Sequence, residues 1–136
     1  MLIGIVVIVG AGILGAMVFS NPAETASQSA NALPREISVQ EAYAMREQGT
    51  LILDVRTPQE WNQGHVPGAT LIPLDELESR LSELPQDEEI VVICRSGNRS
   101  ATARDILLRA GFPAVTSVAG GFNDWTATGY EVAFGP

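Results

Sequence analysis

The run Ile90-Val91-Val92-Ile93 constrains the fold of this chain more than any other part of the sequence. Four consecutive β-branched apolar residues are typical of a strand buried on both faces, as in the middle of a parallel sheet. Elsewhere the chain alternates extended and helical patterns, which predicts an α/β domain whose central parallel sheet is covered by helices on both faces. Further strands are predicted at 51–55, 71–72 and 115–118, and helices between Ser38 and Gly49, from Thr57 onward, and over 75–84, 100–110 and 122–128.

Local signals place the ends of several of these helices. Ser38 and Glu41 have the spacing of a capping box, in which two side chains satisfy the first free N–H groups of a helix. Pro58 follows Thr57 at the first helical position, where its fixed φ suits the helix. In the predicted helix 75–84, three leucines fall on one face and are expected to meet the core: Leu77, Leu81 and Leu84.

Residues 1–19 are predicted to form a transmembrane anchor or an uncleaved signal. Residues 2–19 include no charged side chain, and every charged residue of the chain follows them. As a helix these 18 residues would reach about 27 Å, close to a roughly 30 Å hydrocarbon core. A retained anchor is favoured because the apolar run exceeds a usual signal-peptide core and no clean Ala-x-Ala site follows. The alternative is a buried helix, for which a small domain has little room.

Residues 20–34 are rich in serine, alanine and asparagine, with prolines near both ends and no periodic apolar pattern. They are predicted to be a flexible linker that precedes a globular domain at residues 35–136. The first basic residue is Arg35, so residues 1–19 lack the flanking positive charges from which the positive-inside rule infers orientation. Because the domain is acidic and the segment is N-terminal, we expect a membrane-anchored domain on the extracytoplasmic side.

The charge balance and the rare residue types exclude several classes of function. Sixteen acidic residues against eight basic ones give a net charge of −8, which argues against a nucleic-acid partner. All eight basic residues are arginines, which excludes lysine Schiff-base chemistry and a P-loop lysine. The single cysteine, Cys94, excludes an internal disulfide, a CxxC redox pair and a multi-cysteine zinc site. With His65 as the only histidine, a histidine-rich metal centre is not expected.

The single cysteine follows the expected central strand directly, and the carboxyl ends of strands are where open α/β sheets bind ligands. A thiol that faces a helix N-terminus meets partial positive charge and N–H donors, which stabilise its thiolate. Gly97 allows the backbone to curl successive N–H groups around one centre, and Arg95 and Arg99 add positive charge. The residues of this candidate anion-binding loop are Arg95, Ser96, Gly97, Asn98, Arg99 and Ser100.

The alternative interpretation of Cys94 is a buried, inert core thiol, which the apolar strand before it would suit. A core cysteine, however, needs no adjoining loop of arginine, serine, glycine and asparagine. The sequence therefore favours an activated sulfur nucleophile inside a small cradle that attracts anions.

Four blocks of the sequence, in order and spacing, resemble the single-domain rhodaneses. They are residues 53–56 with Glu60-Trp61, residues 64–69 with 72–74, residues 92–100, and residues 120–125. Together they extend the resemblance over residues 37–134, and four ordered blocks are far more specific than any one of them. The resemblance implies a rhodanese-like three-layer fold with a central parallel sheet.

The resemblance also implies sulfurtransferase activity through a persulfide on Cys94. The thiolate would take sulfur from a small anionic donor such as thiosulfate and pass it to cyanide or a thiol, with no metal or organic cofactor. Arg95 would attract the donor, and the N–H groups of residues 95–100 would stabilise the persulfide. The alternative is a sulfur-carrier or interaction module of the same fold that receives sulfur from a protein partner without turning over small substrates.

Related phosphatases and arsenate reductases are the nearest rivals to this interpretation. They carry a cysteine, five residues and then an arginine that holds the oxyanion, whereas here Arg99 comes after four residues and Ser100 occupies the required position. The shorter loop predicts a cradle sized for sulfur rather than for a tetrahedral phosphate, so phosphatase activity is not expected.

Three polar residues outside the loop are also candidates for supporting roles. Asp54 and Arg56 are expected at a strand end, where the carboxylate would orient a loop arginine or the two would form a fold-supporting ion pair. His65 is predicted to anchor a loop by hydrogen bonding, with a catalytic base as the alternative. Trp61 and Trp125 are expected to pack in the core or at its edge.

Overall fold

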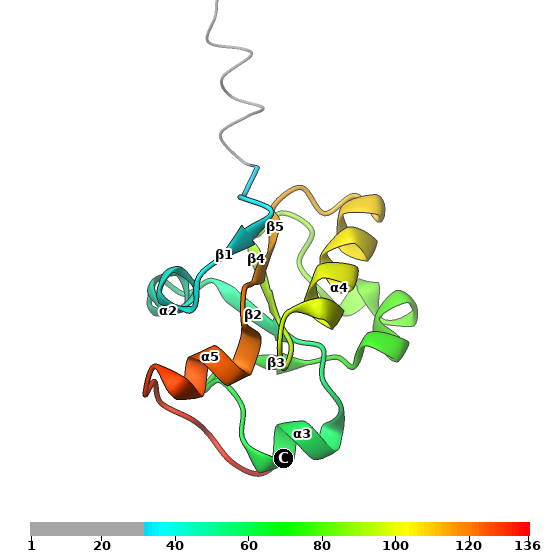
Figure 1. Cartoon of the computed structure of the whole chain (residues 1–136). Helices are drawn as coiled ribbons and strands as arrows, with labels where there is room; N and C mark the ends of the chain where they lie inside the picture. Colours follow the sequence, from blue (N-terminus) through cyan, green and yellow to red (C-terminus); the bar gives the residue numbers. More distant parts are fainter. Residues whose placement is uncertain (1–31) are drawn as a thin grey trace, which may run out of the picture.

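The computed structural model describes residues 32–136, which form five strands, four α-helices and two 3₁₀ helices. In chain order they are β1 (Glu36–Ile37), α2 (Val39–Glu47), β2 (Leu51–Asp54), α3 (Pro58–Gln63), β3 (Thr70–Leu71), η1 (Leu74–Ser79), η2 (Leu81–Glu83), β4 (Ile90–Ile93), α4 (Asn98–Arg109), β5 (Val115–Val118) and α5 (Gly121–Ala127). Figure 1 shows these elements coloured along the chain.

The strands form one parallel sheet in the order β1-β5-β4-β2-β3, so β4 is the central strand. All four residues of β4 are buried, as the apolar run predicted. Asp54 pairs with Ile93, and Val92 pairs with Ser117 on the other side, so the carboxyl ends of β2, β4 and β5 reach one edge of the sheet. The predicted α/β architecture is therefore confirmed, and the cysteine follows the middle strand at that edge.

Two hydrophobic clusters fill the space on either side of the sheet. One joins strand residues to Ala103 and Leu107 of α4 and to Leu77 of η1. The other joins the opposite strand faces to Ala42 of α2 and Trp125 of α5. Figure 1 shows the same division, with α2 and α5 on one side of the sheet and α4 with the 3₁₀ turns on the other. Helical elements thus cover both faces, as expected for a parallel sheet.

The helix starts at α2 and α3 agree with the sequence signals. In α2 the Ser38 hydroxyl accepts from the N–H of Glu41, while the Glu41 carboxylate accepts from the N–H of Ser38. Thr57 and Glu60 make the same reciprocal pair in α3, which begins at a proline. Both capping boxes satisfy N–H groups that a helix end otherwise leaves free.

The single helix predicted over 75–84 is wrong, because the segment forms η1 and η2 instead. Arg80 lies between them with φ −120° and ψ 15°, outside the helical region. Each 3₁₀ helix completes one turn in three residues, so Leu74 and Leu77 face the same way, as do Leu81 and Leu84. This period of three places the leucines against the core without a continuous α-helix.

Other element boundaries also differ from the sequence expectations. The helix predicted from Ser100 begins at Asn98, because Gly97 with φ +114° turns the chain into the helix two residues earlier. β3 covers Thr70–Leu71 rather than 71–72, and α5 begins at Gly121 rather than at residue 122. The two-residue strand β1, which pairs with β5, was not predicted because it is too short to show a pattern.

The predicted membrane segment at residues 1–19 lies outside the described part of the chain, and so does most of the predicted linker. Among residues 32–136, none of the helices combines the length and the apolar character needed to cross a membrane.

Candidate active site

Cys94 lies one residue beyond β4, at the carboxyl edge of the sheet. Its neighbour across the strands is Val55, whose N–H donates to the carbonyl of Ile93 at 3.1 Å. The Cys94 side chain is almost fully buried, at 1% exposure, and packs in the same hydrophobic cluster as Val55. The strand therefore fixes the position of the thiol, and the loop that follows determines its polar surroundings.

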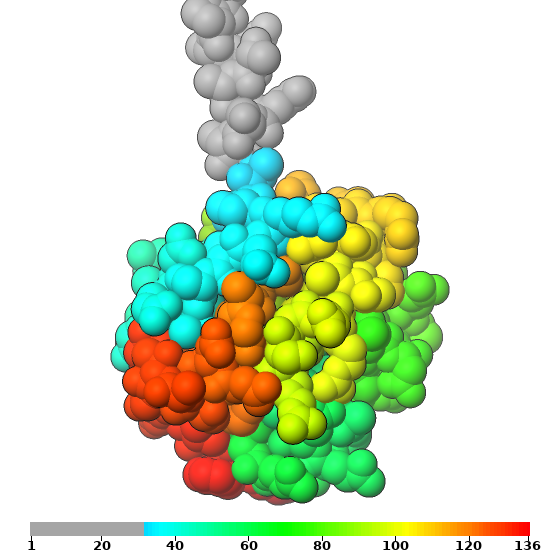
Figure 2. All heavy atoms as spheres, in the orientation of Figure 1, coloured from blue at the N-terminus to red at the C-terminus, as the bar shows by residue number. Residues whose placement is uncertain are grey.

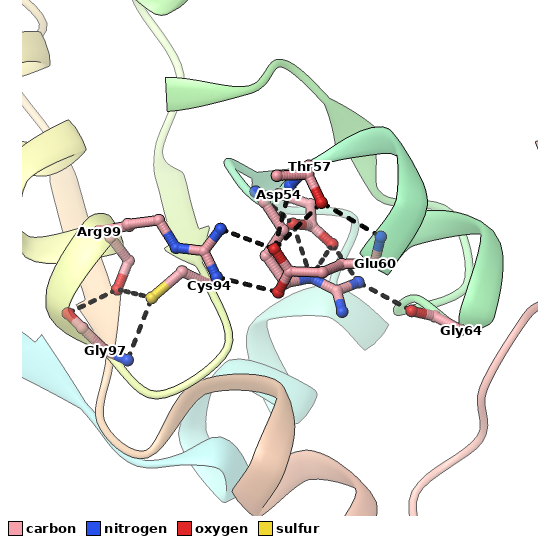
Figure 3. Close-up of polar contacts among 9 residues, drawn as sticks. Asp54, Thr57, Glu60, Gly64, Cys94, Gly97 and Arg99 are labelled. Carbon is pink, nitrogen blue, oxygen red and sulfur yellow. Dashed lines mark hydrogen bonds and ion pairs between the residues drawn. The ribbon is translucent and has the colours of Figure 1, made fainter. Parts of the chain in front are cut away.

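Two groups of the loop contact the sulfur directly (Figure 3). The N–H of Gly97 donates to Cys94 Sγ at 3.0 Å. Ser100 Oγ lies 3.5 Å from Sγ and donates to the Gly97 carbonyl at 3.0 Å. In the thiol form, Cys94 thus donates to Ser100; in the thiolate form, the same hydroxyl is placed to turn and donate to the sulfur.

These contacts lower the pKa of Cys94. Burial alone raises the pKa of a thiol, because a charged sulfur loses its hydration. Hydrogen bonds to the sulfur from the Ser100 hydroxyl and from the N–H groups of Ser100, Gly97 and Ser96 more than offset that effect, so the pKa lies below its ordinary value of 9.0. The site therefore favours the nucleophilic thiolate.

Two backbone hydrogen bonds from α5 hold the start of the loop in place. The N–H of Phe122 donates to the Cys94 carbonyl at 2.8 Å, and the N–H of Asn123 donates to the Arg95 carbonyl at 3.0 Å. Gly121, with φ +55°, allows this approach, since a Cβ there would collide with the Cys94 and Arg95 backbones. Sequence analysis did not assign Gly121 a role in the site, and the glycine pair at the start of α5 was the available signal.

Arg99 is paired with Glu60 of α3, on a different element. The guanidinium donates to both carboxylate oxygens, at 2.8 and 2.9 Å, and Figure 3 shows the Arg99 side chain reaching past Cys94 to Glu60. The hydrogen bonds from Arg99 lower the pKa of Glu60 to about 2, so the carboxylate stays charged at neutral pH. Sequence analysis missed Glu60 as a partner of the loop.

Asp54 and Arg56 form a buried ion pair with each other. Arg56 donates to the two Asp54 carboxylate oxygens at 2.7–3.0 Å, and both side chains are at most 3% exposed. Arg56 also donates to the Gly64 carbonyl at 2.8 Å and lies over the Phe122 ring at 4.3 Å. Of the two predicted alternatives, the structure has the fold-supporting ion pair; Glu60, and not Asp54, orients the loop arginine.

The remaining loop side chains point toward solvent. Arg95, Ser96 and Asn98 are exposed, and Arg95 lines a polar cavity of about 280 Å³ together with Arg56, Glu60, Gln63, Phe122 and Asn123. Figure 2 shows the surface of this region, where the loop meets α5 and α3. The loop thus presents positive charge to solvent above a buried sulfur.

His65 and the tryptophans have structural contacts. The His65 ring stacks on Trp61 with 3.5 Å between centroids, and its Nδ1 lies 2.9 Å from the Trp61 carbonyl oxygen. The His65 backbone pairs with Ala133 near the C-terminus, which is the loop-anchoring arrangement that the sequence predicted. Trp125 is 1% exposed and donates to the Glu131 carbonyl, whereas Trp61 is half-buried.

The family model of the rhodanese-like domain matches residues 38–128. The chain belongs to the rhodanese family. Among its relatives, "Putative sulfur carrier protein YrkF" of Bacillus subtilis is 41% identical over 106 residues, which are 76% of this chain and 56% of that protein. "Thiosulfate sulfurtransferase 16, chloroplastic" of Arabidopsis thaliana is 38% identical over 109 residues, 71% of this chain and 91% of that protein. The chain therefore spans little more than half the length of the Bacillus relative.

Solved structures carry the same fold. A rhodanese-related protein from Thermoplasma volcanium aligns with a TM-score of 0.69 at 34% identity, covering 74% of this chain and 98% of that one. The three-layer rhodanese fold expected from the sequence resemblance is thus confirmed for the described domain.

The rhodanese loop gathers only some of the predicted site residues around the sulfur. The Gly97 N–H and the Ser100 hydroxyl contact the Cys94 sulfur, and the N–H groups of Ser96 and Ser100 help to lower its pKa. The Arg99 side chain turns away to Glu60, and the Asp54–Arg56 pair lies beside the cradle rather than in it. Since Asn98, Arg99 and Ser100 belong to the first turn of α4, the cradle is a helix N-terminus, where N–H groups and the helix dipole favour an anion.

Proposed function

We propose that this chain is a sulfurtransferase that carries sulfane sulfur as a persulfide on Cys94. The observation that carries the proposal is the buried thiol with a lowered pKa, held by N–H and hydroxyl donors at the start of α4. The names of relatives support sulfur transfer as the general chemistry, since they include thiosulfate sulfurtransferases and a putative sulfur carrier.

In the first half-reaction the donor is a small anion such as thiosulfate. The Cys94 thiolate attacks the outer sulfur; a new S–S bond forms, the donor's S–S bond breaks, and sulfite leaves with that electron pair. The charge balances, because a thiolate and a dianion give a persulfide anion and a dianion. Arg95, exposed on the polar cavity, attracts the donor, and the N–H groups of residues 95–100 hold the persulfide.

In the second half-reaction the acceptor attacks the outer sulfur of the persulfide. Cyanide leaves as thiocyanate, and a thiol leaves as an organic persulfide. In both cases the Cys94–S bond breaks and its electron pair regenerates the thiolate. The residues described here supply every group that this cycle needs, so we propose no metal or organic cofactor.

A sulfur carrier that exchanges sulfur with a protein partner is the second candidate function. The match to a relative named as a putative sulfur carrier supports it, although this chain covers only 56% of that relative. Such a carrier would form the Cys94 persulfide but discharge it poorly to small acceptors.

We also propose that residues 1–19 anchor the chain in a membrane, with the domain on the extracytoplasmic side. The uncharged run at residues 2–19 supports this proposal. Membranes from expressing cells, washed at high salt and at alkaline pH, are expected to retain the full-length chain. Release of full-length chain by either wash would contradict the anchor, and protection of the domain from protease added to intact spheroplasts would contradict the orientation.

Thiocyanate formation from thiosulfate and cyanide tests the enzymatic proposal. Wild-type protein is expected to turn over many times, Cys94→Ser not at all, and the control Ser79→Ala, on the exposed 3₁₀ helix η1, at the wild-type rate. Formation of the Cys94 persulfide with little or no thiocyanate would favour the carrier instead. Equal turnover by Cys94→Ser and wild type would contradict both.

A further inference from the structure

A second cavity, of about 380 Å³, opens beside the cradle at the carboxyl edge of the sheet. Its apolar walls come from Val55, Pro73 and Leu74. The volume is in the range of cavities that bind small organic ligands, about 300 to 1,000 Å³. Thiosulfate and cyanide are far smaller and gain nothing from apolar walls, so their proposed binding at the cradle leaves this cavity unexplained.

The cavity adjoins the sulfur through the sheet register. Asp54 pairs with Ile93, so the residues that follow them, Val55 and Cys94, lie side by side at the ends of β2 and β4. The N–H of Leu74 donates to the Val55 carbonyl at 3.1 Å, which brings the third apolar wall to the same edge. Val55 and Cys94 also share one hydrophobic cluster, against which Leu74 packs. An occupant of the cavity therefore lies against Val55, the neighbour of Cys94 across the strands.

The Arg99–Glu60 ion pair stands between this cavity and the polar one. Arg99 lines the apolar cavity, whereas Glu60 lines the polar cavity that also includes Arg95. The two cavities thus approach the cradle from different sides. Arg95, which has no ion-pair partner among residues 32–136, lines only the polar cavity.

The charges around the apolar cavity disfavour an anion. Arg56 and Arg99 both line it, but Asp54 and Glu60 neutralise them. Asp75, exposed at the cavity rim, forms no ion pair with any residue of the described domain. The uncompensated charge at the cavity is therefore negative, which opposes the entry of a carboxylate or sulfonate.

We propose that this cavity binds the organic part of the sulfur acceptor, which is a small thiol with an apolar body and no negative charge. This inference rests on the proposed persulfide chemistry of Cys94 and assigns the acceptor class for that same site. The donor enters from the Arg95 side and the acceptor from the Val55–Leu74 side. Separate entry sides explain how one cradle handles an anion and an apolar thiol.

The transfer step balances without any further reactant. The acceptor thiol attacks the outer sulfur of the Cys94 persulfide and forms an R–S–S bond. The bond between that sulfur and Cys94 Sγ breaks, and its electron pair stays on Cys94 as the thiolate. The acceptor's proton passes to the outer sulfur, so the products are an organic persulfide and the starting enzyme.

Discharge of a preloaded persulfide tests this assignment. The full-length protein is loaded with thiosulfate, freed of excess donor, and mixed with butanethiol, 3-mercaptopropionate or cyanide, while mass spectrometry follows the loss of the extra sulfur. The two thiols are similar in size and thiol basicity but differ in charge. We expect butanethiol to discharge the wild-type persulfide about tenfold faster than 3-mercaptopropionate.

Variants at the cavity separate the binding effect from general reactivity. Leu74→Trp fills the cavity and is expected to lower the ratio of butanethiol to cyanide discharge about tenfold. Asp75→Asn removes the rim charge and is expected to speed 3-mercaptopropionate discharge about threefold. Leu108→Trp and Asp87→Asn, at exposed positions of α4 and of the turn before β4, are the matched controls and are expected to behave as wild type. Because Leu74 also contacts the core, the Asp75 variant tests the proposal independently.

The outcomes distinguish this inference from the proposed function. If no persulfide forms on Cys94, both the sulfurtransferase proposal and the acceptor assignment that depends on it are wrong. If the persulfide forms and cyanide discharges it, but the two thiols react equally and neither cavity variant changes their ratio, the acceptor assignment alone is wrong.

Discussion

Arg99, in the first turn of α4, forms an ion pair with Glu60 of α3 through two hydrogen bonds of 2.8 and 2.9 Å. The pair joins the loop after the central strand to the helix after β2 and neutralises one of the two arginines of the loop. Arg95 is left as the exposed cation of the cradle. Glu60 therefore limits how much positive charge the donor meets.

Replacing Glu60 with glutamine should strengthen donor binding. Glutamine keeps the volume of the side chain and accepts the capping bond from Thr57, but it frees the charge of Arg99. An added positive charge near the site that improves the binding free energy of thiosulfate by about 1 kcal/mol lowers its KM about fivefold. Because salt screens this charge, the KM should also depend more steeply on salt concentration. Steady-state kinetics at several salt concentrations measure this effect. A KM that stays the same or rises would show that Arg99 without its partner does not attract the donor; Glu83→Gln, at the surface pair with Arg80, is the control.

Replacing Ser100 with alanine should move the pH dependence of persulfide formation to higher pH. The Ser100 hydroxyl stabilises the thiolate, so its loss raises the pKa of Cys94. Since the rate rises as pH rises through that pKa, the variant should be slower below it and regain rate at alkaline pH. A lost hydrogen bond of about 1 kcal/mol gives a rate about fivefold lower at pH values below the pKa of Cys94.

The measurement is the initial rate of persulfide formation between pH 5 and pH 10 in both proteins, a range of about five units around the usual thiol pKa. A rate reduced equally at every pH would contradict the role assigned to the hydroxyl. The Glu60 carboxylate does not confuse this profile, because its pKa of about 2 keeps it ionised throughout.

Replacing Asp54 with asparagine should destabilise the fold. The variant leaves the Arg56 guanidinium buried without its counter-charge, which costs about 3 to 5 kcal/mol of the free energy of unfolding. Glu83→Gln breaks the half-exposed pair with Arg80 and should cost less than about 1 kcal/mol. Denaturant unfolding of the two variants gives both values. Equal, small losses would show that the buried pair contributes no more than a surface one.

Replacing Gly121 with alanine should damage the site as well as the fold. A Cβ there collides with the Cys94 and Arg95 backbones, so the loop must shift. Displacement of the thiol by about 1 Å lowers the rate of persulfide formation about a hundredfold. The control is Gly129→Ala, which also has positive φ, at +85°, but has no atom within 4 Å of the new Cβ.

Gly129→Ala should cost about 1 kcal/mol of stability through backbone strain and leave the rate unchanged. Similar rates for the two alanine variants would contradict the role of α5 as a support for the loop.

The sequence was sufficient to predict the features that depend on neighbouring residues. The apolar run of β4 and the capping box of Ser38 and Glu41 are local signals, and both appear in the structure as expected. The cysteine at the strand end followed from the same local pattern. Features set by tertiary approach were not predictable in this way. Glu60 is 39 residues from Arg99, and only the tertiary fold brings the first turn of α4 close enough to α3 to make them partners.

Two further differences have the same cause. Gly97 was recognised as a turn residue, but its φ of +114° starts α4 at once, and the sequence does not encode that choice locally. The leucines of residues 74–84 fit either one α-helix or two 3₁₀ turns, and the core decides between them. The position of Cys94 at the strand end was thus predictable, whereas the partners of the loop were not.

The central claim is that Cys94 accepts a sulfur atom from thiosulfate. Mass spectrometry of the full-length protein after incubation with thiosulfate, followed by peptide mapping under non-reducing conditions, tests it most directly. We expect a mass gain of one sulfur atom on Cys94, absent from Cys94→Ser and removed by cyanide. An unmodified Cys94 in wild-type protein, or a sulfur adduct that persists in Cys94→Ser, would contradict it.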